Sequence, residues 1–520
     1  MNKKDTKFNS IYFLFLPLLI YFGKRSLIAY DEGFYALQAR WIIEKSNWIG
    51  PIWWDQVTSD RTIGIQFLIA LSKNFFGDAL FVIYIPILLA AILMLYCTYQ
   101  LHKELIQDKN PIYSALILST TFLWINYAHM ATQDMVFSSL VSLGILSTIK
   151  AYKTNNKIQI LISGSWIGLA VMMKTYLTVI PFLGIFPFLI RSKLIYKRNF
   201  WIGTILGFLP FAFWSYQYIS IYSFSTYSGL FEKLMFLSKK NHFTNPLYYY
   251  LWNFSINIFP WTIPCFVGIF KASRFKRISK YFLFYYPIFI LALLSLFSTK
   301  TPYYPIQILS LISLNTYIGI KYFIENSKKN IIFFIEKINF ILIPILTILF
   351  TIIINSLGII YLDNRSKPFI FIGAGLFSLI WIMYSLLKDK NRKFILAILG
   401  PYFLILFLVQ SGLITDKSKE LRIAIDDLFK NEKLSNKSIE IIKSEIKDDE
   451  ALSKIIKIMV KTPKIGERRL DNLSLLSEDS YAWTTKEFSK NIELEKYQIV
   501  NEEKIFYPWK LIYKKKISSN

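Results

Sequence analysis

Long apolar runs separated by short polar loops dominate the first four fifths of the 520-residue chain. Representative runs cover residues 79–101, 200–222 and 338–362. Each is long enough to cross the hydrocarbon core of a bilayer as a helix, which takes roughly 20 apolar residues. Because backbone polar groups in lipid must be satisfied internally, such runs assemble as helices. The pattern predicts a mainly α, polytopic transmembrane bundle of about 13 spans.

The pattern changes after residue 413, where long apolar runs end. Residues 421–430 and 438–446 have the spacing of amphipathic helices, whereas residues 497–500 and 509–516 are typical of strands. We therefore expect two domains. Residues 1–413 form the membrane domain, whose first outer loop, 24–78, carries interfacial helices, and residues 414–520 form a small soluble, extracytoplasmic α/β domain.

The composition is typical of a membrane protein, and the distribution of charge bears on whether the protein binds nucleic acid. Mean hydropathy is +0.39 and 54% of residues are hydrophobic, too apolar for an ordinary soluble core of this length. The formal net charge of +26 is spread over short loops rather than gathered on one face, which argues against nucleic acid as a partner. Cys97 and Cys265 lie far apart in apolar segments, so no disulfide framework is indicated.

Loop charges predict the orientation. Alternate loops at residues 150–157, 191–199, 271–280 and 388–393 are dense in Lys and Arg, as is the N-terminus. The positive-inside rule makes this side cytoplasmic, with the first apolar run kept as an uncleaved span. An odd number of spans then places the tail after residue 413 on the non-cytoplasmic side, together with most of the unusual polar residues.

The first outer loop is far longer than a turn requires, and such loops are usually functional. Asp31 and Glu32 begin an amphipathic pattern in which Leu37, Trp41 and Ile42 are apolar, so a helix lying along the membrane interface is expected. The acidic pair has two interpretations. It is either a catalytic carboxylate pair or ordinary compensation of a helix N-terminus.

Four further polar residues interrupt apolar sequence on the outer side. Asp134 is either an N-cap or part of a polar site. Lys174 and Lys300 either snorkel or, with Arg61, bind a phosphate, and their placement opposes the charge rule. His242 is either structural or a ligand, with Asp31, of a divalent metal, although no familiar metal-binding spacing is present.

Five segments, taken in order, resemble the polytopic glycosyltransferases that use polyprenyl-phosphate sugars. The resemblance is to the protein O-mannosyltransferase group and, most closely, to the bacterial transferase that adds 4-amino-4-deoxy-L-arabinose to lipid A. The matching segments, within residues 30–320, are YDEGFYALQARWIIEKSNWIGP, TQDMVFSSLVSLGI, MMKTYLTVIPF, HFTNPLYYYLWNFSINIFPW and STKTPYYPIQILSLISL. The resemblance implies a GT-C-like bundle in a bacterial inner membrane.

The resemblance also implies residue roles. It makes Asp31 the principal catalytic carboxylate, with Glu32 beside it. Lys174, Lys300, Arg61 and Tyr303 would bind the donor phosphate, and Asp60 falls on the family's acidic-basic pattern, with Thr62 in place of proline. The residues given supporting roles are Asp134, Asp60, His242 and Tyr35.

The function that follows is transfer of a sugar from a polyprenyl-phosphate donor to an envelope acceptor, a glycolipid such as lipid A or a protein, on the non-cytoplasmic face. Cations suit a departing phosphate and a carboxylate suits an attacking hydroxyl. No cofactor is required, and a divalent metal stays open. The alternatives are a transporter or lipid flippase, although transporters usually keep their charges at the bilayer midplane, and a non-catalytic scaffold on the same fold.

Overall fold

A computed structural model describes residues 5–54, 56–232, 245–326, 329–357, 364–431, 434, 436–442, 446, 448–485 and 496–516. The chain forms two compact units. The first unit comprises Met1–Phe22, Thr58–Leu68 and Tyr84–Thr415, and the second comprises Gly23–Val57, Ile69–Ile83 and Asp416–Asn520. Helix α3, Gly64–Phe76, belongs to both units, so the division falls within the first outer loop as well as before the tail.

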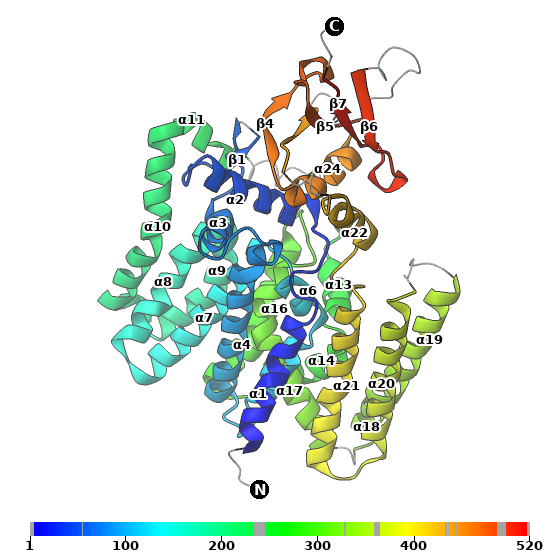
Figure 1. Ribbon diagram of the computed structural model, residues 1–520. Helices are drawn as coiled ribbons and strands as arrows, with labels where there is room; N and C mark the ends of the chain where they lie inside the picture. Colours follow the sequence, from blue (N-terminus) through cyan, green and yellow to red (C-terminus); the bar gives the residue numbers. More distant parts are fainter. Residues whose placement is uncertain are drawn as a thin grey trace. The chain divides into compact units, whose positions relative to one another are not determined.

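The first unit is a bundle of helices, shown in Figure 1. Its longer helices are α1 (Asp5–Leu19), α4 (Ile85–Leu105), α7 (Gln133–Thr154), α8 (Lys157–Lys174), α9 (Val179–Arg191), α10 (Arg198–Tyr222), α14 (Thr262–Ala272), α16 (Tyr286–Leu296), α17 (Leu309–Asn326), α19 (Ile343–Leu357), α20 (Lys367–Leu386) and α21 (Lys390–Gln410). Its shorter helices are α5 (Ile112–Ser119), α6 (Phe122–Ala128), α11 (Phe224–Tyr227), α13 (Tyr249–Asn257), α15 (Arg277–Lys280) and α18 (Asn330–Lys337).

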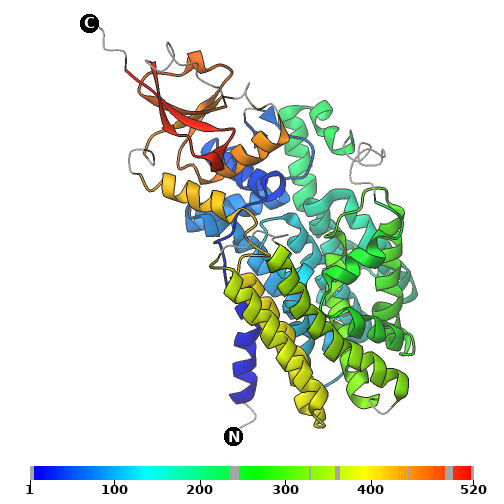
Figure 2. The same cartoon turned by 90° about the vertical axis from the view of Figure 1, so that its right-hand side faces the viewer.

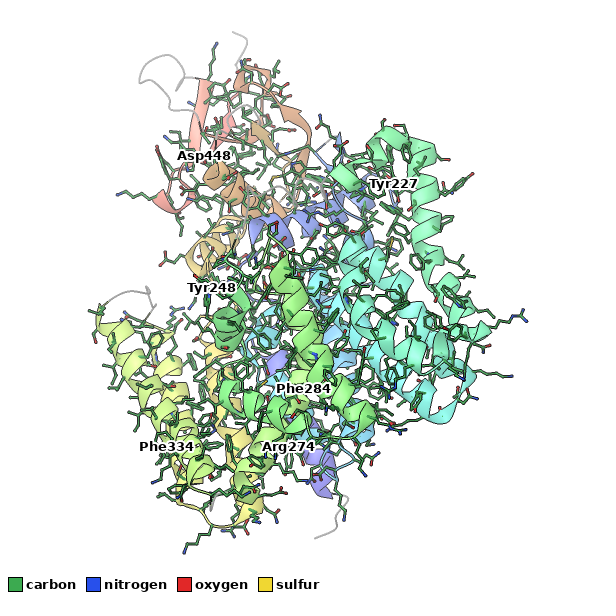
Figure 3. All side chains as sticks on the ribbon, turned by 180° about the vertical axis from the view of Figure 1, so that it is seen from behind. Tyr227, Tyr248, Arg274, Phe284, Phe334 and Asp448 are labelled. Atoms are coloured by element: carbon green, nitrogen blue, oxygen red, sulfur yellow. The ribbon has the colours of Figure 1, made fainter. Side chains whose placement is uncertain are left out.

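Apolar side chains cover much of the outside of this unit, as a protein surrounded by lipid requires. Only 11% of the most apolar window of Asn330–Leu357 is buried, and Phe334 on α18, labelled in Figure 3, is 65% exposed. Figure 2 shows α19, α20 and α21 packed side by side. The chain is an integral membrane protein with the mainly α bundle that the sequence predicts.

The number of spans is a separate question. Among the described residues, seven helical segments are long and apolar enough to cross a membrane, or eight with the bent pair α13 and α14. The seven leave out α10, although Ile205, Leu209 and Phe213 on it are exposed. The expected number of about 13 therefore stays a prediction.

Helices α8 and α10 approach to backbone contact at Gly203 and Gly207 of α10. A Cβ added to Gly203 would lie 1.9 Å from the carbonyl oxygen of Leu161, and one added to Gly207 would lie 2.0 Å from that of Ser165. Only glycine allows two helices to approach this closely.

The second unit contains a five-stranded sheet with helices. The strands, in the spatial order β4-β3-β5-β7-β6, are β3 (Ile439–Ile442), β4 (Ile465–Leu470), β5 (Ser480–Thr484), β6 (Tyr497–Asn501) and β7 (Lys510–Lys514). β3 is parallel to both of its neighbours, and β7 is antiparallel to β5 and β6. The unit also holds α2 (Phe34–Glu44), α22 (Lys419–Leu428), α24 (Asp449–Lys461) and a small hairpin of β1 (Ile52–Trp53) and β2 (Gln56–Val57).

Two expectations are corrected here. Residues 438–446 were expected to be helical, but 439–442 form β3, because this isoleucine-rich segment is buried between two parallel strands and sheet packing overrides a helical spacing. The apolar face of α2 was expected at a membrane interface. Instead Leu37 and Trp41 are buried in one core with α22, α24 and the sheet, and Phe34 stacks on Trp53 at 4.1 Å.

Candidate functional site

A buried ion pair joins two helix ends in the first unit. Asp134 lies in the first turn of α7 and Lys174 in the last turn of α8, positions where the helix dipoles favour an anion and a cation respectively. The Lys174 ammonium donates to the Asp134 carboxylate, and both residues are 6% exposed. Thr132, not Asp134, is the N-cap of α7, and Lys174 does not snorkel. The N-cap and snorkelling interpretations are therefore replaced by a buried ion pair, and a role of the two residues in a phosphate-binding site stays a prediction.

Aromatic rings surround this pair. The Lys174 Nζ lies 4.8 Å from the ring centre of Tyr303, 5.4 Å from that of Tyr304 and 5.9 Å from that of Phe137. The pair and these rings line a small pocket completed by Ser138, Leu177, Leu294 and Gln307. Ring faces at these distances attract a cation, so they add to the contacts that the Lys174 ammonium makes with Asp134. The structure thus brings together three sequence-predicted residues, Lys174, Asp134 and Tyr303.

Lys300 is also buried, at 4% exposure, just before the turn that leads into α17. Its Nζ donates to the carbonyl of Asn245 at 2.7 Å, and the Asn245 amide donates back to the Lys300 carbonyl at 3.1 Å. The Tyr250 hydroxyl donates to the carbonyl of Thr301 at 2.9 Å. Lys300 is therefore fixed by the entrance to α13, and the snorkelling interpretation fails for it as well.

Arg61 lies beside Asp60 in the first unit. Its Nε and its terminal nitrogen each lie 2.9 Å from Asp60 Oδ2, and its side chain is 20% exposed. Two bonds to one carboxylate hold the guanidinium plane in place while part of it still faces outward. The pairing follows the adjacent acidic-basic motif that the sequence presents.

The acidic pair Asp31 and Glu32 belongs to the second unit, in the helical turn η1, Ala29–Gly33. The two carboxylates differ. Glu32 is completely buried, lies 3.1 Å from the Arg25 guanidinium and accepts the Ile28 N–H at 3.0 Å. Asp31 is only partly buried. Glu32 therefore holds the turn, and Asp31 is the member that a substrate could reach.

Arg25 was missed in the sequence. The signal was present, because Arg25 lies at the start of the predicted outer loop and, like Lys174 and Lys300, opposes the positive-inside rule if that orientation holds.

Three other expectations concern metal and supporting residues. Tyr35 is buried at 2% exposure in α2 of the second unit. His242 lies outside the described residues. Within the described part of the chain, no group of three His, Cys, Asp or Glu side chains could hold a metal ion. A metal held by Asp31 and His242 therefore stays a prediction.

Comparison with solved structures decides the fold. The crystal structure of ArnT from Cupriavidus metallidurans bound to undecaprenyl phosphate matches with a TM-score of 0.77 at 12% identity, covering 98% of this chain and 98% of that one. This chain has the ArnT fold. The apo state of ArnT from the same organism gives a TM-score of 0.66 at 12% identity, with 96% of each chain covered.

A family model matches part of the sequence. Residues 60–216 match the family described as dolichyl-phosphate-mannose-protein mannosyltransferase. This segment contains Asp60, Arg61, Asp134 and Lys174, and leaves Asp31 and Lys300 outside. No curated protein sequence matches the chain. The ArnT fold and the family match confirm the resemblance to polytopic glycosyltransferases that the five motifs indicate.

Proposed function

We propose that this protein is a membrane glycosyltransferase that moves a sugar from a polyprenyl-phosphate donor to an envelope acceptor, a glycolipid such as lipid A or a protein. The reaction takes place on the non-cytoplasmic face of a bacterial inner membrane and inverts the anomeric centre. The comparisons support the donor class, because the matching ArnT structure is described as bound to undecaprenyl phosphate.

The observation that carries the proposal is the burial of Lys174 and Lys300 at 6% and 4% exposure near helix ends of the first unit. Burying an ammonium is costly, so such cations persist where they are paired or where they serve a charge. When the bond from the anomeric carbon to the phosphate oxygen breaks, negative charge grows on the departing lipid phosphate. Cations placed beforehand in a low-dielectric site stabilise that charge. Arg61 and the hydroxyl of Tyr303 would complete the phosphate contacts.

The Asp31 carboxylate would act on the acceptor, whereas the cations act on the departing phosphate. As the acceptor oxygen forms its bond to the anomeric carbon, Asp31 would take the proton of the acceptor hydroxyl, which is general-base catalysis. Glu32 cannot share this task because it is buried in its ion pair with Arg25. One displacement with one base requires no cofactor.

The test is transfer of radiolabelled sugar from polyprenyl phosphate in membranes by an Asp31→Asn variant at matched expression. Asparagine keeps the shape of the side chain and loses its basicity, so transfer should fall by about 10² to 10⁴-fold while donor binding changes little. Asparagine is also almost as good as aspartate near a helix start. Undiminished transfer by this variant would remove Asp31 from the chemistry.

A further inference from the structure

The turn that carries Asp31 depends on residues almost four hundred positions away in the chain. The Ser26 N–H donates to Asp416 Oδ1 at 2.7 Å, and the Ser418 N–H donates to Ser26 Oγ at 2.8 Å. Arg422 fixes Asp416 at 3.0 Å, and the ammonium of Lys457 on α24 donates to Ser418 Oγ at 2.9 Å. The segment that enters the turn is therefore held at Ser26, through both its N–H and its hydroxyl, by the first residues of the tail.

Helix α24 contacts the turn at the residue before Asp31. The Tyr30 hydroxyl donates to the carbonyl of Asp449 at 2.8 Å, in the first turn of α24. Asp448, labelled in Figure 3, caps this end of the helix by accepting the Ala451 N–H at 2.7 Å. Burial, together with the nearby Asp449 carboxylate, raises the pKa of the Tyr30 phenol, so this group stays a donor at neutral pH.

Helix α24 also contacts the turn at Gly33, the last residue of the turn. Gly33 has φ −63° and ψ −41°, an ordinary helical conformation open to any residue, and its N–H donates to the Ile28 carbonyl at 2.9 Å. A Cβ at this position would nevertheless lie 2.6 Å from Cγ2 of Ile456, a side chain with no exposed surface. Glycine is needed here because α24 is close, not because the backbone is unusual.

We infer that α24 is the positioning element of the proposed active site, and that Tyr30, Gly33 and Ile456 are positioning residues that set where the Asp31 carboxylate stands. The inference rests on the proposed function for the role of Asp31. It gives the tail a task in the proposed reaction, because one hydrophobic core includes both Ala29 of the acidic turn and Ile456 of α24.

The test adds a methyl group at Gly33 and removes side-chain atoms from Ile456, which lies opposite it. Gly33→Ala should push the turn off Ile456 and lower kcat by about 10- to 100-fold, the usual cost of displacing a reacting group by about 1 Å, while KM for the donor stays within about twofold. Ile456→Ala should also lower kcat, because the turn loses its support. The double variant Gly33→Ala/Ile456→Ala places the new methyl group where the old side chain stood, and should recover most of kcat.

The matched control is Gly375→Ala on α20, where an added Cβ meets nothing within 4 Å, and kcat should equal that of the wild type. Normal turnover in Gly33→Ala, or a double variant no better than the worse single one, would overturn the inference. Hydrogen exchange at residues 28–34 in the purified full-length protein gives a readout that needs no activity. Exchange should accelerate in Gly33→Ala and slow again in the double variant.

This second readout separates the two hypotheses. If the wild-type protein transfers no sugar while exchange follows the expected order, the proposed function fails and the positioning contact stands. If exchange at the turn is the same in all variants, α24 does not position it, whatever the activity.

Discussion

In the described part of the chain, two ion pairs have both partners buried, Lys174 with Asp134 in the first unit and Arg25 with Glu32 in the second. Taking both charges of a pair out of water costs about as much as their attraction returns, so such pairs contribute more to specificity than to stability. The Lys174–Asp134 pair lies in the pocket lined by aromatic rings. Glu32, held by Arg25, accepts a hydrogen bond within the turn that carries Asp31.

The first pair gives a prediction that separates folding from catalysis. Lys174→Met leaves the buried Asp134 carboxylate without its cation, so unfolding in detergent should become easier by about 3–5 kcal/mol. Lys174→Met/Asp134→Leu removes both charges at similar volume and should recover most of that loss without restoring sugar transfer. Thermal unfolding and the transfer assay together check this. Equal stability of wild type and single variant would mean that the pair is not buried in the folded protein.

At this scale the sequence singles out unusual polar residues but does not predict which of them pair. Lys174 and Lys300 stand out because they oppose the charge rule, and Arg25 opposes it in the same way. That Lys174 meets Asp134 follows from the packing of α7 on α8, and neither local spacing nor charge specifies such a contact between helices. The ion pair between Lys174 and Asp134 was therefore found only in the structure.

The α8–α10 contact gives the element-scale prediction. Gly207→Ala would place a methyl group 2.0 Å from a backbone oxygen of Ser165, and a backbone cannot rotate away as a side chain can. The two helices must separate, so the folded protein should lose at least about 1–3 kcal/mol, the usual range for overpacking. Thermal unfolding in detergent measures the loss. Gly375→Ala is the control and should be neutral or slightly stabilising, since alanine favours helices and nothing lies within 4 Å. A Gly207→Ala variant as stable as this control would contradict the close contact.

Helices and strands of the second unit were predictable where the spacing of apolar residues matches the secondary structure that they form. The amphipathic pattern of residues 421–430 corresponds to α22, Lys419–Leu428, and the strand-like segments near the end correspond to β6 and β7. The pattern failed at 439–442, where three isoleucines in four residues form a strand that lies between two parallel neighbours, β4 and β5. The amphipathicity of α2 was read correctly and its partner was not, because a hydrophobic face does not reveal whether lipid or another domain covers it.

At the scale of the whole molecule, Gly23–Val57 and Ile69–Ile83 form one unit with the tail, Asp416–Asn520, although most of the chain lies between them in sequence. Contacts that join residues so distant in sequence form late, because closing the intervening chain costs entropy before the contacts return any stability. The acidic turn is thus completed only once the tail has been made, and a chain shortened before Asp416 would lack the groups that hold Ser26.

The orientation of the chain is the last prediction, and it depends on whether the number of spans is odd or even. Seven spans would place the two ends of the first unit on opposite sides of the membrane, whereas eight would place them on the same side, and both numbers fit the described helices. The basic loop at 388–393 decides between them, because the positive-inside rule makes it cytoplasmic and one span, α21, then separates it from the tail. Alkaline phosphatase fused after Leu413 should therefore be active and green fluorescent protein at the same point dark, since the former folds only outside the cytoplasm and the latter only within it. Fusions after Asn156, in a basic loop, should give the reverse pattern. A fluorescent fusion after Leu413 would place the tail, and with it the Asp31 turn whose segment it binds, in the cytoplasm, where a sugar donor on the outer leaflet could not reach it.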